Sequence, residues 1–191
     1  MDLVHQKPGR AVFVDRDGTI NVDPGYLSNP DQMALIPGVG PALAALQKVG
    51  FLLVVVSNQS GVGRGLIRPD ALSLIHARME CLLAIDGVKV DRYSLCLHRP
   101  EDECECRKPK PFLIHQAAKE LGVLVSSSYM VGDKISDLEA GRAAGCAASL
   151  LVRTGDGINA EKKLSPKDSG FVVNSLVEAA QWILARETSN P

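Results

Sequence analysis

Five apolar runs alternate with helical patterns along the chain, and this alternation limits the possible folds more than any other feature of the sequence. The runs are rich in Val, Leu and Ile at consecutive positions, which is typical of parallel strands covered by helices on both faces. They cover residues 10–15, 51–57, 92–98, 128–133 and 147–153.

A stripe of apolar side chains at helical spacing follows each run. The stripes start at Val39, Leu72, Ile114, Leu138 and Leu176. Right-handed crossovers between successive strands then predict an α/β fold, a doubly wound, Rossmann-like parallel sheet in three α/β/α layers. A length of 191 residues suits one domain, so we expect residues 1–191 to form a single unit with a terminal helix at about 174–187.

Charge and composition exclude several classes of function. A net charge of −1 gives no general attraction to nucleic acid or to an anionic membrane, so we expect neither as a partner. No apolar stretch reaches the roughly 18 residues that a membrane span needs, and the first residues lack the apolar core of a signal peptide, which favours a cytoplasmic location. No surplus apolar helix face stands out, and we therefore expect a monomer.

Polar side chains stand where the predicted strands end. Asp15 and Asp17 follow the first run, Ser57 and Asn58 end the second, and Asp133 ends the fourth. Ligands of such sheets bind at the carboxyl ends of the strands, so these side chains are expected to meet in one crevice. The connection at 18–37 is unusually long, which indicates either a functional loop or disorder.

The pair Asp15 and Asp17 raises the sharpest question, because two like charges directly after a buried strand repel each other. One interpretation is a simple turn, since Asp and Gly favour turns. A calcium loop is a poor match, because Thr19 and Tyr26 stand where such a loop needs acids. A divalent cation with a phosphoryl group offers a better explanation, since it needs a carboxylate mount for the metal and a carboxylate nucleophile beside it.

The motif DRDGT at 15–19 resembles the signature of the haloacid-dehalogenase superfamily of phosphohydrolases. The other motifs of that superfamily follow in order, with Ser57 after the second strand, Lys108 in CRKPKP, and Asp133 with Asp137 in VGDKISD. The resemblance spans about residues 10–155. It implies a capless phosphatase, because no gap between the motifs holds a cap domain, and an open crevice bordered by the loops 20–28, 59–65 and 96–108.

The resemblance also implies a role for each motif residue. Asp15 attacks phosphorus to form an aspartyl-phosphate, and Asp17 protonates the leaving oxygen and then deprotonates water. Ser57 and Lys108 hold phosphoryl oxygens. Mg²⁺ is held by Asp15, by the main-chain carbonyl of Asp17 and by Asp133. Asp137 orients Lys108 or caps the helix that follows.

Cys96, His98, Cys104 and Cys106 form a second cluster of possible ligands. Three thiolates and an imidazole fill all four positions of a structural zinc site, so we expect a zinc-stabilised loop that ends beside Arg107 and Lys108. The alternative is a set of free cysteines with a chance histidine. Of the remaining cysteines and histidines, Cys81 and Cys146 are expected to be buried. His5, His76 and His115 are expected to be structural or solvated.

Within the superfamily, a zinc loop without a cap resembles two bacterial groups, the phosphatases of a heptose bisphosphate and those of histidinol phosphate. The stretches DRDGTINVDPGYL and SNQSGVGRG favour the first group, which contributes to the synthesis of lipopolysaccharide and other surface glycans. Arg64, Arg107 and Lys134 exceed what one phosphoryl group requires and suit a second phosphate. By resemblance, the substrate contacts are Asp23, Pro24, Gly25, Tyr26, Asn58, Gln59, Ser60, Arg107 and Lys134.

Two other functions remain open at this point. The compact ECECRKPK segment is similar in both bacterial groups, so histidinol phosphate stays a candidate substrate. A non-catalytic, zinc-stabilised binding module is a function of a different class. The sequence argues against it, since no catalytic position of the superfamily is missing.

Overall fold

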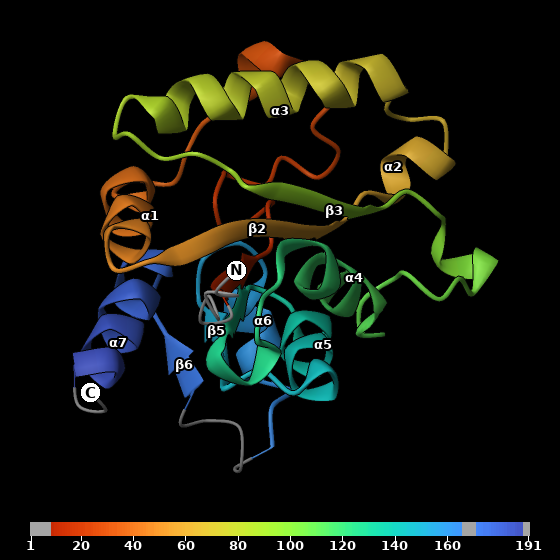
Figure 1. Ribbon diagram of the computed structural model, residues 1–191. Helices are drawn as coiled ribbons and strands as arrows, with labels where there is room; N and C mark the ends of the chain where they lie inside the picture. The colour runs from red at the N-terminus through yellow and green to blue at the C-terminus, as the bar shows by residue number, and fades with distance from the viewer. Residues whose placement is uncertain (1–8, 166–170, 189–191) are drawn as a thin grey trace, which may run out of the picture.

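The computed structural model describes residues 9–165 and 171–188, and a parallel sheet forms its centre (Figure 1). The strands are β1 (Arg10–Val14), β2 (Phe51–Asn58), β3 (Arg92–Cys96), β4 (Tyr129–Gly132), β5 (Ala148–Val152) and β6 (Val172–Val173). They are ordered β3-β2-β1-β4-β5-β6 across the sheet, and every neighbouring pair is parallel. The order reverses its direction between β1 and β4, which is where ligands of doubly wound sheets bind.

Helices connect the strands and cover both faces of the sheet. They are α1 (Val39–Lys48), α2 (Ser60–Gly63), α3 (Pro69–Ala84), α4 (Phe112–Leu121), α5 (Ile135–Ala144), α6 (Gly157–Glu161) and α7 (Leu176–Thr188). Short 3₁₀ turns lie at Pro30–Gln32, Pro100–Asp102 and Val125–Ser127. Figure 1 shows α1 beside α7 on one side of the molecule and α4 beside α5 on the other.

Two hydrophobic clusters fill the space between these layers. Successive side chains of a strand point to opposite faces, so one strand contributes to both clusters. Val12 and Val14 of β1 pack with residues of α1, α3 and α7, whereas Ala11 and Phe13 pack with residues of α4 and α5. The predicted three-layer α/β/α architecture is therefore confirmed.

The differences from the sequence prediction lie in short or terminal elements. All five predicted strands and all five predicted helices are present, but β6, α2 and α6 are too short to show a periodic pattern. α5 begins before Leu138, because the Asp137 carboxylate accepts a hydrogen bond from the backbone N–H of Lys134 at 2.9 Å and caps the start of the helix. α7 continues to Thr188, where Glu187 accepts a hydrogen bond from the hydroxyl of Tyr129.

The long connection at 18–37 is ordered. Ile20, Leu27 and Met33 are buried in the cluster beneath α1 and α3, so the segment is anchored to the core and holds its polar residues at the edge of the sheet. None of the helices in 9–165 and 171–188 is long and apolar enough to cross a lipid bilayer.

Candidate active site

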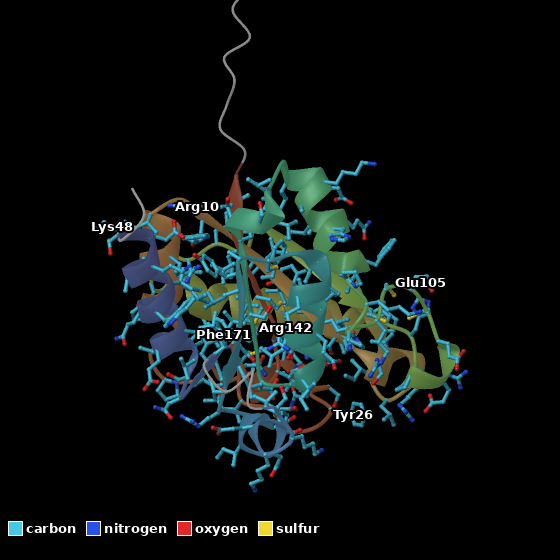
Figure 2. The ribbon with its side chains drawn as sticks, turned by 90° about the horizontal axis from the view of Figure 1, so that it is seen from below. Arg10, Tyr26, Lys48, Glu105, Arg142 and Phe171 are labelled. Atoms are coloured by element: carbon cyan, nitrogen blue, oxygen red, sulfur yellow. The ribbon has the colours of Figure 1, made fainter. Side chains whose placement is uncertain are left out.

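A cavity of about 480 Å³ opens at the carboxyl ends of the central strands. All of the predicted substrate contacts except Pro24 line it, together with Asp17 and Lys108. Figure 2 shows Tyr26, one of these residues, at the opposite end of the molecule from Arg10, where β1 begins. The side chains that interrupt the apolar pattern at the strand ends are therefore brought to one place.

Asp15 lies beside this cavity and is paired with Lys108, a buried cation that lines it. The carboxylate is 3% exposed, and the Nζ atom of Lys108 lies 2.9 Å from its Oδ1 atom. The same ammonium lies 2.6 Å from Oδ1 of Asp137, so Asp137 both orients Lys108 and caps α5. Burial opposes ionisation of Asp15, but the charges of Lys108 and Lys134 outweigh it and lower the pKa of the carboxyl.

Asp133 gives the clearest indication of a cation-binding site. Ligand oxygens of Asp15, Asp133 and Asp137 all lie within 4.8 Å of one another, and all three residues are buried. Oδ2 of Asp133 accepts a hydrogen bond from the backbone N–H of Asp156, whereas Oδ1 is buried with no hydrogen-bond partner in the described parts of the chain. Burial, followed by the charge of Asp15, raises the pKa of Asp133 to about 7. An orphaned oxygen among clustered carboxylates fits an octahedral divalent cation.

Two glycines enclose the Asp133 carboxylate. A Cβ atom would lie 2.3 Å from Asp133 Oδ2 if built on Gly18, and 2.2 Å from it if built on Gly155. Both residues have a positive φ, of 81° and 59°. The Thr154 hydroxyl ties the two loops together by donating to the carbonyl of Gly18 at 2.6 Å. The glycine of the DRDG motif is thus required for the close approach of β1 and β5 loops around Asp133.

Asp17 has a separate set of partners. Its carboxylate accepts hydrogen bonds from the side chains of Arg16, Asn21 and Gln59. The Nε2 atom of Gln59 donates both to Asp17, at 2.8 Å, and to the Ser57 hydroxyl, at 2.9 Å. Gln59 therefore joins two residues that the sequence motifs place on different strands.

Asn58 also contacts the protein more than the cavity. Its Nδ2 atom donates to the carbonyl of Lys108, and its Oδ1 atom accepts from the N–H of Lys108, each at 3.1 Å. This reciprocal pair fixes the backbone of Lys108 against the end of β2. The sequence correctly predicts that Asn58 lies at the cavity. Both polar atoms of its amide, however, bond the backbone of Lys108 in the neighbouring loop.

Sequence reasoning misses two residues of the site, Arg16 at the wall of the cavity and His76 behind it. Arg16 is fully buried and its guanidinium reaches Asp17, Gln59 and His76. His76 lies on α3, and its ring stacks on that of Tyr93 with a centroid separation of 4.3 Å. No local signal marks either residue, because Arg is ordinarily exposed and the two residues are 60 positions apart.

The half-buried imidazole of His76 predicts a loss of stability in acid. Burial, followed by the charge of Arg16, lowers its pKa from 6.5 to about 4. Between pH 6.5 and 4 the imidazole therefore binds a proton in the unfolded chain but not in the folded chain. The free energy of unfolding falls as the pH drops through this range.

We expect a His76→Gln variant to lose less stability between pH 7.5 and 5 than the wild type, by at most about 2 kcal/mol. Urea unfolding at the two pH values measures the difference. Equal losses in both proteins would contradict a neutral buried imidazole. A His115→Gln variant is the matched control, because His115 lies on the exposed face of α4.

The four predicted zinc ligands form a compact tetrad. Cys96 Sγ lies 3.5 Å from Cys104 Sγ and 3.8 Å from His98 Nδ1, and Cys106 Sγ lies 3.5 Å from Cys104 Sγ and 3.3 Å from His98 Nδ1. Bonds of about 2.3 Å to sulfur and about 2.0 Å to nitrogen around a tetrahedral ion give ligand separations close to these values. The donor set therefore fits zinc, in a loop whose Glu105 projects from the edge of the molecule in Figure 2.

The prediction of a buried Cys81 is wrong, because this residue is exposed on α3, and Cys146 is only partly buried against the core. His115 is exposed and lies 3.1 Å from the carbonyl of Ala144, which agrees with a structural or solvated histidine, while His5 lies outside the described residues. Arg64 forms an ion pair with Glu101 at 3.0 Å and does not line the cavity, so it is not a further cation of the site.

Comparisons with known proteins agree with this geometry. A family model described as HAD-hydrolase-like matches residues 105–179. The chain is 43% identical to the D-glycero-beta-D-manno-heptose-1,7-bisphosphate 7-phosphatase of Haemophilus ducreyi, over 91% of this chain and 98% of the relative. It is 40% identical to the protein of that name from Escherichia coli K12, over 91% and 93% of the two chains.

A solved structure shows the same arrangement of the backbone. The D,D-heptose 1,7-bisphosphate phosphatase of B. bronchiseptica, crystallised with magnesium and phosphate, superimposes with a TM-score of 0.86 at 35% identity. The match covers 93% of this chain and 99% of the other. The protein in that crystal, which binds magnesium and phosphate, therefore has the same overall fold as this chain.

Proposed function

The chain belongs to the haloacid-dehalogenase-like family of heptose 1,7-bisphosphate 7-phosphatases, and we propose that it hydrolyses the 7-phosphate of D-glycero-D-manno-heptose 1,7-bisphosphate. One observation carries the proposal at the level of chemistry. Asp15 is a buried carboxylate with a lowered pKa, paired with the cavity residue Lys108 and clustered with the free oxygen of Asp133. Such a group is suited to attack on a phosphoryl group whose charge is neutralised from two sides.

The reaction proceeds in two displacements. Asp15 attacks phosphorus and forms an aspartyl-phosphate, while the bond to the sugar oxygen breaks and Asp17, which enters the reaction as the protonated carboxylic acid, gives that oxygen its proton. Asp17, now a carboxylate, takes a proton from a water molecule, which attacks phosphorus and releases inorganic phosphate and free Asp15. The Ser57 hydroxyl and the Lys108 ammonium hold the phosphoryl oxygens during both steps.

Magnesium fits the carboxylates beside Asp15. The residues that would hold it are Asp15, the Asp17 carbonyl and Asp133, and when bound it would neutralise charge on the transferring phosphoryl group. Asp137 is not assigned to the metal, because its Oδ1 is paired with Lys108.

The cations of the cavity favour a bisphosphate. Arg107 and Lys134 line the cavity in addition to Lys108, and Lys134 lies 3.9 Å from Asp23 on the opposite loop. Two cations beyond the reacting group suit a second phosphate of the same sugar. Histidinol phosphate carries an amine instead, which would prefer acidic neighbours.

A panel of phosphate esters tests this function. The heptose bisphosphate, in both anomeric forms, is expected to exceed histidinol phosphate in kcat/KM by orders of magnitude, with ³¹P NMR showing loss of the 7-phosphate and retention of the anomeric phosphate. Heptose 7-phosphate is the matched control for the second phosphate and should be hydrolysed less efficiently. Preference for histidinol phosphate would overturn the proposal in favour of that substrate.

We also propose zinc as the ion of the cysteine tetrad, with a structural role. Cys106 directly precedes Arg107 and Lys108, so an ordered tetrad places both cations at the cavity. Zinc binding contributes roughly 10–16 kcal/mol in small peptides, which is ample to order such a loop.

Removing zinc with a strong chelator, followed by restoration of Mg²⁺, is expected to lower both the melting temperature and kcat/KM. Hydrogen exchange should increase within residues 96–108. Cys104→Ser should reproduce these changes in untreated protein, whereas Cys81→Ser, at an exposed site outside the tetrad, should not. Unchanged melting and kinetics in zinc-free protein would contradict the structural role.

Three broader properties complete the proposal. A single sheet joins β1 to β6, which supports one phosphatase domain over residues 1–191. We propose that this domain acts as a monomer in the cytoplasm, where charged sugar phosphates are retained, and that it supplies heptose precursors of lipopolysaccharide or other surface glycans. Sedimentation velocity tests the monomer, and cell fractionation tests the location.

A further inference from the structure

Arg16 stands out because its side chain is buried and its hydrogen bonds go to side chains of the site. The side chain is 1% exposed. Its Nη2 atom donates to Asp17 Oδ2 at 2.7 Å, to Asp17 Oδ1 at 3.0 Å and to Gln59 Oε1 at 3.0 Å. Its Nε atom donates to Asp17 Oδ1 at 3.1 Å. A charge buried this deeply is costly unless it is fully paired.

The two acids of the DRDG motif therefore have separate cations. Asp15 is paired with Lys108, which lies 93 positions away, whereas Asp17 is paired with its own neighbour Arg16. Arg16 borders the cavity, but its side chain is 1% exposed and its hydrogen bonds go to Asp17, Gln59 and His76. Most of these bonds go to Asp17, which is 15% exposed, so we expect Arg16 to act on the reaction mainly through Asp17.

His76 fixes the far end of the guanidinium. The Nη1 atom of Arg16 lies 3.2 Å from Nε2 of His76. A guanidinium only donates hydrogen bonds, so Nε2 must be the acceptor and the imidazole must be neutral, with its proton on Nδ1. The stacked ring of Tyr93 then sets the plane of the imidazole.

We propose that Arg16 is a positioning residue for Asp17, held in turn by His76, and that it aims the Asp17 carboxyl at the leaving oxygen of the substrate. The inference rests on the role of Asp17 in the proposed function. The planar fork of Arg16 fixes the direction of the carboxylate, which a lysine ammonium at the same place does not. Gln59 supplies a second fixed point, since it bonds both Arg16 and Asp17.

A positioning role for the proton donor has a signature that a structural role lacks. A sugar alkoxide leaves poorly without a proton, whereas p-nitrophenolate leaves readily without one. Misplacing Asp17 should therefore slow the hydrolysis of a sugar phosphate much more than that of p-nitrophenyl phosphate. Binding does not depend on this proton, so KM should change little while kcat falls.

The test compares Arg16→Lys, Arg16→Met and Asp17→Asn on both esters. Arg16→Lys is expected to lose about 10²-fold in kcat on the sugar phosphate, within the range of acid–base catalysis, and far less on p-nitrophenyl phosphate. Asp17→Asn should show the same selectivity with a larger loss. Arg68→Met, which removes an exposed arginine directly before α3, should change neither rate. Equal losses on both esters in folded Arg16→Lys would overturn the proposal.

A second pair of variants decides the matter if the Arg16 variants do not fold. His76→Leu removes the acceptor of Arg16, whereas the amide oxygen of Gln in His76→Gln can replace Nε2. The proposal requires the selective loss in His76→Leu and its recovery in His76→Gln, and identical kinetics in the two would overturn it. Any alkyl phosphate that the wild type hydrolyses serves in these comparisons, including histidinol phosphate. A failure of the proposed substrate is thus distinct from a failure of the Arg16 inference.

Discussion

Asp15→Asn is expected to lower kcat on heptose 1,7-bisphosphate by about 10⁴-fold or more, because an amide cannot act as the nucleophile. The fold should survive, since asparagine has the same shape and Lys108 keeps its second partner, Asp137, at 2.6 Å. Phosphate release and thermal melting, measured on the same preparation, separate the two effects.

Asp70→Asn is the matched control, because Asp70 is an exposed acid of α3 that pairs with Arg68. It should retain the rate of the wild type. Full turnover by Asp15→Asn would place the chemistry elsewhere and return the non-catalytic binding module to consideration. A loss of melting temperature that matched the loss of activity would leave no support for Asp15 as nucleophile.

Lys108→Met is expected to abolish turnover and to destabilise the fold. The change leaves the buried carboxylates of Asp15 and Asp137 without the cation they share, beside the third carboxylate of Asp133. Burial alone would lower the pKa of Lys108. The negative charges of Asp137 and Asp15 outweigh burial, so the pKa of Lys108 is raised. Breaking a buried pair of this kind costs about 3–5 kcal/mol.

A double-mutant cycle with Asp137→Asn checks the cause of this destabilisation by urea unfolding. The double variant should recover much of the stability lost in Lys108→Met, because it removes one of the unpaired charges, and it should recover no activity. Additivity within about 0.5 kcal/mol would contradict a direct interaction between the two groups. Added Mg²⁺ should also stabilise Lys108→Met more than the double variant.

The positions of Asp15, Ser57 and Asp133 could be predicted because a simple rule connects sequence to place. Each residue follows an apolar run, and parallel strands bring their carboxyl ends to one edge of the sheet. The tetrad of Cys96, His98, Cys104 and Cys106 could be found for a similar reason, since the two members of each pair are two positions apart in the sequence and both pairs belong to one loop. The tetrad is visible as a local sequence pattern, and the strand-end residues follow from a general rule of parallel sheets.

The network around Asp17 could not be predicted, because it depends on contacts between distant segments. Arg16 is buried only because Gln59 from the end of β2 and His76 from α3 accept its hydrogen bonds. A sequence gives no sign of such a convergence. Composition statistics even argue against it, since arginine is rarely buried.

Asn58 and Gln59 illustrate an intermediate case. Their position at the cavity follows from the strand that precedes them, and both line it. Their hydrogen bonds to Lys108 and to Asp17 could not be foreseen, because the choice among possible partners is made by the tertiary structure. For these residues the sequence predicts the position at the cavity, whereas only the structure identifies the hydrogen-bond partners.

The most direct test of the account is to trap the covalent intermediate. A single turnover of heptose 1,7-bisphosphate, quenched with borohydride, should convert Asp15 to homoserine, and peptide mass spectrometry should detect this change at residue 15 alone. The released sugar should retain its anomeric phosphate. Rapid phosphate release with an unmodified Asp15, or reduction at another carboxylate, would contradict the account.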